Sequence, residues 1–150
     1  GLEIFPAVMG AVEARDDKVS TAGDLPIAVV HAQSPDAGRH AASTLQAVES
    51  IRGHPLKVII LEAADLDTYA GPPLAGIFVA NAGIEGARLR SWSERLRTLV
   101  FSPFPGDVEA GAVAGVHVSD QVLPFLNLPQ AARAGVRFRP FLFRVARHHE

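Results

Sequence analysis

Six histidines are the first candidates for chemistry, because imidazole binds metals and transfers protons near neutral pH. Only His148 and His149 are neighbours, and the other four lie far apart along the chain. Metal sites draw their ligands from short, regular spacings, and no H-E-x-x-H pattern is present. The chain also has no cysteine, so thiolate ligands, thiol catalysis and disulfides are excluded. We therefore expect no metal site and no cofactor.

Two carboxylates in the stretch "EAADLDTY", Asp65 and Asp67, are the next candidates, because an acid–base pair needs two such groups close together. They follow a predicted strand, where short acidic clusters commonly cap helices or face water in turns. Glycine-rich nucleotide loops and the G-x-S-x-G elbow of hydrolases are missing from the sequence. The sequence therefore predicts no catalytic residue and a protein that is not an enzyme. A hydrolase that uses Asp65, Asp67 or a histidine is the catalytic alternative.

The C-terminal part of the chain is basic and aromatic, and it has no acidic residue from Gln121 to His149. A net charge of −2 and a pI near 6.3 argue against nucleic acid as a partner. No segment approaches the roughly 18 to 20 consecutive apolar residues that span a bilayer, so we expect no direct membrane insertion. A helix that begins at Pro140 would place Phe141, Leu142, Val145 and Ala146 on one apolar face that packs on the sheet, with Phe143 outside it. The candidates for a partner interface are Arg137, Arg139, Phe143, Arg144 and Arg147.

Apolar runs alternate with amphipathic segments along the chain, which is typical of a parallel sheet covered by helices on both faces. We expect strands at 26–32, 56–61, 76–80, 97–102, 112–120 and 122–127, the last two forming a hairpin through Ser119 and Asp120. We expect helices at 2–14, 34–53, within 81–96, in the alanine-rich 131–135 and from Pro140 onward. The sequence predicts a three-layer α/β domain over residues 1–150, mainly parallel, with a late antiparallel hairpin and a C-terminal helix.

In an open parallel sheet, ligands bind beyond the carboxyl ends of the strands. Four polar residues follow predicted strands at that edge, and we expect them to line any ligand groove: Ser34, Asp36, Asn81 and Ser102. Ser34 also precedes a predicted helix, where it would help to hold an anion. The alternative is that these four residues are helix caps and turn residues.

The block "GVHVSDQVLPFLNLPQAARAGVRFRPFLFRVAR" resembles the C-terminal signature of the YfiR-like family of bacterial periplasmic proteins. In that signature, a strand ending in Asn-Leu leads to an alanine-rich helix, an apolar-basic step and a last helix of the form Leu-x-x-x-Ala-Arg. The corresponding segments here are 127–128, 131–135, 136–139 and 142–147. Upstream, "GIFVANAG" and "LRTLVFSPFPGDVEAG" are similar to other parts of the family pattern.

The resemblance implies a small, non-catalytic periplasmic protein, often a homodimer, from which a signal peptide has been removed. The family's type member represses a membrane-anchored diguanylate cyclase by binding its periplasmic domain, and so restrains cyclic-di-GMP signalling. This chain departs from the pattern in lacking cysteine and in its more basic "RFRPF" step. The leading hypothesis is therefore a regulatory protein that acts by protein–protein contact. The alternative is a small-ligand-binding α/β module resembling one lobe of a periplasmic binding protein.

Overall fold

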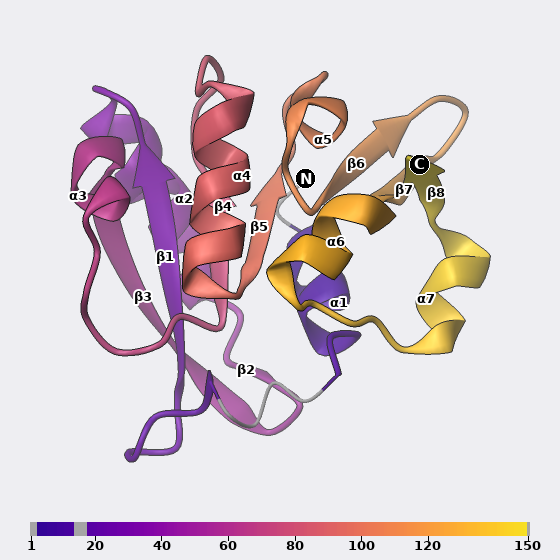
Figure 1. Ribbon diagram of the computed structural model, residues 1–150. Helices are drawn as coiled ribbons and strands as arrows, with labels where there is room; N and C mark the ends of the chain where they lie inside the picture. The colour runs from indigo at the N-terminus through magenta and orange to yellow at the C-terminus, as the bar shows by residue number, and fades with distance from the viewer. Residues whose placement is uncertain (1–2, 14–17, 150) are drawn as a thin grey trace.

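The computed structural model describes residues 3–13 and 18–149 (Figure 1). In chain order the elements are α1 (Ile4–Gly10), β1 (Leu25–His31), α2 (Pro35–Gln46), β2 (Ser50–Ile51), β3 (His54–Glu62), α3 (Ala63–Asp67), β4 (Gly76–Val79), α4 (Gly86–Leu96), β5 (Leu99–Ser102), α5 (Asp107–Ala110), β6 (Ala114–Val118), β7 (Val122–Asn127), α6 (Leu128–Ala134), α7 (Pro140–Val145) and β8 (Arg147–His149).

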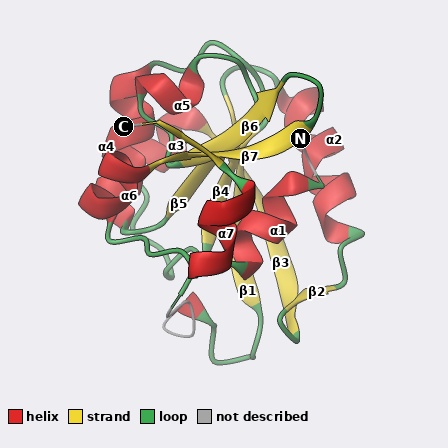
Figure 2. Ribbon diagram, turned by 90° about the vertical axis from the view of Figure 1, so that its right-hand side faces the viewer, coloured by secondary structure: helices red, strands yellow, loops and turns green. Residues whose placement is uncertain are grey.

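The strands form one eight-stranded sheet in the order β2-β3-β1-β4-β5-β6-β7-β8. The strands β3, β1, β4, β5 and β6 run parallel, and β6 and β7 form the expected antiparallel hairpin. Helices α1 and α2 cover one face of the sheet, and α3 and α4 cover the other (Figures 1 and 2). The predicted fold class is confirmed.

Strand β1 is buried along its whole length. Leu25, Ile27 and Val29 belong to one hydrophobic core, and Ala28 and Val30 belong to the other. On the α1/α2 face, Phe5 packs edge-on against Phe78 and Phe101, with ring centroids 5.4 and 5.3 Å apart. On the other face, Trp92 is fully buried. A continuous run of apolar residues such as "LPIAVV" is what burial on both faces requires.

The helix predicted over 34–53 is too long, because α2 ends at Gln46. The chain then forms β2, which pairs antiparallel with β3 at Ile51 and His54, and Gly53 makes the tight turn with φ 83°. Buried Ile51 continues the apolar spacing of the helix, so periodicity alone favours a longer helix. Two short helices, α3 and α5, also occupy segments for which the sequence pattern indicates loops. The predicted helix 2–14 is shorter as well: α1 spans Ile4–Gly10, while residues 2 and 14 lie outside the described residues.

The predicted apolar face of the last helix is wrong in part. Leu142 is buried and Ala146 packs against the core, but Phe141 and Val145 are 51% and 53% exposed. The reason is that α7 has only six residues, after which the chain becomes extended and β8 pairs in parallel with β7. A helix of six residues has room for little more than one turn, and Leu142 is its buried side chain. Phe143 is 37% exposed, as its place outside the predicted face indicates.

No helix in the described part of the chain has the length and apolar content needed to cross a membrane.

Asn127 ties three elements together at the end of β7. Its Oδ1 accepts the Gln130 N–H at 3.1 Å and so caps α6, while its Nδ2 donates to the Val108 carbonyl at 2.8 Å. The side chain is buried, so each lost hydrogen bond leaves a buried group unpaired.

We expect Asn127→Ala to lower the free energy of unfolding by about 2 to 4 kcal/mol, as the cost of one helix cap and one buried hydrogen bond. Asn127→Ser, which keeps the capping oxygen, should lose less than the alanine variant. Urea denaturation of the three proteins measures both differences. Equal stability of all three would contradict this role.

Candidate functional site

The crevice at the carboxyl ends of β1 and β4 is the place where this topology binds ligands. From β1 the chain crosses to β3 on one side and then returns past β1 to β4 on the other. Connections therefore leave β1 and β4 in opposite directions, and a gap opens between them at the carboxyl edge. The site is built from the residues that follow these two strands.

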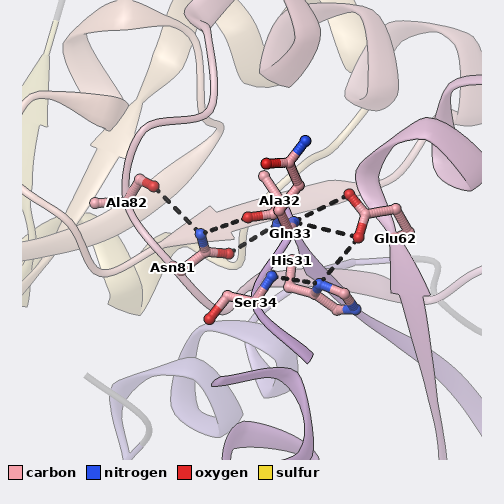
Figure 3. Close-up of polar contacts among 7 residues, drawn as sticks. All are labelled: His31, Ala32, Gln33, Ser34, Glu62, Asn81 and Ala82. Atoms are coloured by element: carbon pink, nitrogen blue, oxygen red, sulfur yellow. Dashed lines mark hydrogen bonds and ion pairs between the residues drawn. The ribbon is translucent and has the colours of Figure 1, made fainter. Parts of the chain in front are cut away.

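Asn81, just after β4, holds the two strand ends together (Figure 3). Its Oδ1 accepts the Ala32 N–H at 2.9 Å, and its Nδ2 donates to the Ala32 carbonyl at 3.2 Å and the Ala82 carbonyl at 3.4 Å. The side chain thus pairs with β1 as a further strand residue would. Asn81 is at the predicted edge, but its amide braces the crevice and is not free to contact a ligand.

Glu62 and His31 form a second brace beside it (Figure 3). The carboxylate of Glu62 accepts the Gln33 N–H at 3.1 and 3.2 Å, which fixes Gln33 in the left-handed region with φ 56°. Buried His31 places Nδ1 3.2 Å from Glu62 Oε2 and 3.2 Å from the Ser34 nitrogen. A neutral Nδ1 accepts the Ser34 N–H, whereas a protonated one donates to Glu62. A strained backbone held by such contacts is a feature of functional loops.

Ser34 and Asp36 lie at the start of α2, as predicted. The Ser34 side chain makes no capping hydrogen bond, and the first bond of the helix runs from the Gly38 N–H to the Ser34 carbonyl at 3.2 Å. Asp36 is exposed and forms an ion pair with Arg39. As at any helix start, the N–H groups of the first turn make no hydrogen bond within the helix, and Pro35 has no N–H.

Ser102, the last residue of β5, is fully buried. Its hydroxyl donates to Asp107 Oδ2 at 2.6 Å and accepts the Phe104 N–H at 3.3 Å, which fixes the loop 103–106. Burial raises the pKa of the Asp107 carboxyl, although the hydrogen bond from Ser102 opposes that effect. Ser102 thus shapes the wall of the site and does not face into it.

A pocket of about 260 Å³ lies at this edge, on the α1/α2 face of the sheet. Its lining comes from the first turns of α2, the end of β4 and the loop after β5: Ala37, His40, Ala41, Phe78, Ala80, Pro103 and Phe104. None of the four predicted groove residues is among them, although each is within three positions of one. The polar residues predicted to line the site brace it, and mostly apolar residues form the walls of the pocket.

The two candidate carboxylates, Asp65 and Asp67, lie in α3, and Asp67 has a structural role. Asp67 accepts hydrogen bonds from Trp92 Nε1 at 2.8 Å and Arg88 Nη2 at 2.7 Å, and the Arg88 contact holds its pKa below the ordinary value. Asp65 makes no such contact. No group of histidine and carboxylate side chains in the described residues could hold a metal ion.

The five predicted interface residues lie just before α7, within it and at the start of β8, the strand at the edge of the sheet opposite β2. Arg137, Arg144 and Arg147 are exposed, and Phe143 contacts the ring of His148 with centroids 5.8 Å apart. Arg139 is different: its N–H donates to the Ala11 carbonyl at 2.7 Å, and its Nε is buried without a partner among the described residues. Its stem is thus part of the fold.

Comparison with models of known protein families gives no match, and comparison with curated proteins gives none either. Solved structures do match. The ABC domain in complex with L-Trp from Streptococcus pneumonia has a TM-score of 0.58 and 10% identity over 87% of this chain. A conserved domain protein from Vibrio cholerae O1 biovar eltor has a TM-score of 0.57 and 14% identity over 90% of this chain. This chain spans 57% of each of those chains, and the likeness shows a shared α/β fold.

Asp107→Asn tests the electrostatics of the braced loop. Because the folded pKa of Asp107 is raised, the folded state binds its proton more tightly than the unfolded chain does. This group's contribution to stability therefore falls as pH rises from about 4, the unfolded value, through the folded pKa. Asparagine can still accept from Ser102, so the variant should equal or exceed the parent stability at pH 7 and approach it near pH 3. Urea titrations across that range measure the difference. A variant less stable at pH 7 than at pH 3, relative to the parent, would contradict this assignment.

Proposed function

We propose that this protein is a non-catalytic module that binds a small organic ligand in the pocket at the carboxyl ends of β4 and β5. The observation that carries the proposal is the position of the pocket at the carboxyl edge of the sheet, beside the crevice between β1 and β4 where doubly wound sheets bind ligands. Its walls are apolar, with His40 and the start of α2 as the polar groups. That combination of an apolar cavity and few polar groups is typical of ligand sites.

The size of the pocket limits the ligand. At about 260 Å³ it is just below the usual range of roughly 300 to 1,000 Å³ for drug-sized molecules, so an occupant the size of an amino acid fits best. Phe78 and Phe104 offer rings for an apolar body, and His40 on α2 offers a polar group. The similar domain from Streptococcus pneumonia is in complex with L-Trp, which supports a ligand of this class.

Thermal unfolding with L-Trp and the other amino acids at millimolar concentration tests the proposal. A ligand at 100 times its dissociation constant stabilises the folded state by about 2.7 kcal/mol, which raises the melting temperature by several degrees. Ala80→Leu fills the pocket and should abolish the shift, while Ala132→Leu, the same change on the exposed side of α6, should keep it. No shift with any amino acid, or an unchanged shift in Ala80→Leu, would overturn the proposal.

A second function rests on the basic, aromatic surface around α7, made of Arg137, Phe141, Phe143, Arg144, Val145 and Arg147. Three of its apolar side chains are 37–53% exposed, and its arginines form no ion pair within the described residues. An apolar centre with unpaired cations around it suits an acidic protein surface. The resemblance to the YfiR-like family suggests the periplasmic domain of a membrane-anchored diguanylate cyclase as that partner, and repression as the outcome. It also suggests a periplasmic location and a possible homodimer.

The test of this second function is binding to the periplasmic domain of a cyclase encoded beside the gene of this protein. Arg144→Glu should weaken binding about tenfold or more and reduce its salt dependence, because a cation at the contact becomes an anion. Arg39→Glu makes the same change on α2 and should leave binding unchanged. Calorimetry at two salt concentrations measures both. Equal effects of the two substitutions, or no binding by the parent, would count against the function.

A further inference from the structure

A second, larger cavity lies at the opposite end of the sheet, near the amino ends of β1 and β3. Its volume is about 520 Å³, twice that of the carboxyl-end pocket. Pro26 and Lys57, which are register partners, form its floor together with Ile59. Side chains at these positions face the α3/α4 side, whereas the first pocket is on the α1/α2 side. The two cavities therefore share no wall.

The walls of this cavity are two loops that hydrogen bonds hold in place. The turn 20–24 is closed by the Ser20 N–H to the Asp24 carbonyl at 2.8 Å and by the Ser20 hydroxyl to Asp24 Oδ1 at 2.6 Å. In the loop after α3, Tyr69 Oη donates to the Pro72 carbonyl at 2.6 Å. Gly71 packs so closely that an added Cβ would lie 2.8 Å from Tyr69 Oη. The cavity is thus preformed on both sides.

The lining is mostly apolar and contains flat groups. Tyr69 supplies an aromatic ring, and Pro26, Pro72 and Pro73 supply pyrrolidine rings. An aromatic ring packs well against a planar ligand, and the prolines add apolar surface beside it. Burial raises the pKa of the Tyr69 phenol, so this group stays neutral and does not repel an anion.

The charged groups on the cavity wall favour an anionic ligand. Among the described residues, Lys57 is the one cation that lines the cavity, and none of their carboxylates lies within ion-pair distance of its Nζ. The chain's other lysine, Lys18, instead donates to the Leu96 carbonyl at 3.4 Å. Asp24 is also on the wall, but its carboxylate already accepts the Ser20 hydroxyl. The unpaired group is therefore an ammonium.

We propose that this amino-end cavity is a binding site for a small carboxylate with a flat, apolar body. The carboxylate pairs with Lys57 on β3, and the body packs between Tyr69 and the prolines. Repulsion from Asp24 orients the ligand, because it keeps the anionic end away from the turn. The site is independent of the carboxyl-end pocket and of the function proposed for it.

Three probes of one shape and different charge test the proposal: benzoate, benzamide and benzylamine. With only two lysines in the chain, 13C-dimethylation gives one signal for Lys57 and one for Lys18, and it preserves both charges. Benzoate should shift the signal of Lys57 and the ring protons of Tyr69, which is the only tyrosine. Benzamide should bind at least fivefold more weakly, and benzylamine should bind more weakly still. Equal binding of the three, or shifts of Lys18 as large as those of Lys57, would overturn the proposal.

Substitutions test the role of each charged group and the independence of the two pockets. Lys57→Met, at an exposed strand position, should weaken benzoate binding about tenfold and leave benzamide unchanged, while Lys18→Met should alter neither. Asp24→Asn should strengthen benzoate binding, because it removes the repelling charge. Ala80→Leu in the other pocket should have no effect, so failure here and failure of the proposed function are distinguishable. Unchanged benzoate affinity in Lys57→Met refutes the ion pair and with it the proposal.

Discussion

The burial of β1 on both faces is the constraint on which the rest of this structure depends. From Leu25 to Val30 the strand has no exposed hydrophobic side chain, so helices must cover both sides of the sheet. Covering both sides requires connections that run in opposite directions along the sheet, from β1 toward β3 and from β4 toward β5. The crevice between β1 and β4 follows from that requirement, and it would exist whatever side chains stood at the edge. Function then depends on how the edge is filled.

At the edge, polar side chains are used for geometry. Asn81 pairs with the backbone of Ala32, Glu62 holds Gln33, and Ser102 holds Asp107. Loops at a strand edge carry backbone groups that the sheet does not pair, and these groups need partners once they are buried. Amide, carboxylate and hydroxyl side chains supply those partners at low cost. The pocket is left with apolar walls because its polar neighbours are engaged with the backbone.

This difference between polar residues that brace the edge and apolar residues that line the pocket explains how much the sequence could predict. Buried runs such as "AVV" and "IFV" locate β1 and β4 well, and the strand order gives the edge where a site belongs. The polar residues at that edge were predicted as ligand contacts, but nothing in their identity distinguishes a brace from a contact. Whether a polar residue is a brace or a ligand contact depends on which backbone group lies opposite its side chain, and only the fold determines that. His40 and Phe104, which do line the pocket, show no pattern in the sequence that separates them from core or surface residues.

The predicted apolar face of the last helix is wrong in part for a related reason. The apolar spacing of Phe141, Leu142 and Val145 is helical, and the helix forms, but pairing of β8 with β7 ends it after six residues. A parallel pairing with a distant strand leaves no trace in local periodicity. Its consequence is that apolar side chains which a longer helix would turn inward stay at the surface beside unpaired arginines.

The two cavities lie on opposite faces and at opposite ends of strands that are packed on both sides. Close-packed sheets of this kind resist continuous deformation, so a small ligand in one cavity has no soft path by which to reshape the other. Coupling between sites requires an element with two arrangements. The braces described above each favour one arrangement, with the exception of His31, whose Nδ1 can pair with either Ser34 or Glu62. Any change of shape that accompanies binding should therefore begin at the carboxyl edge of β1, where these alternatives meet.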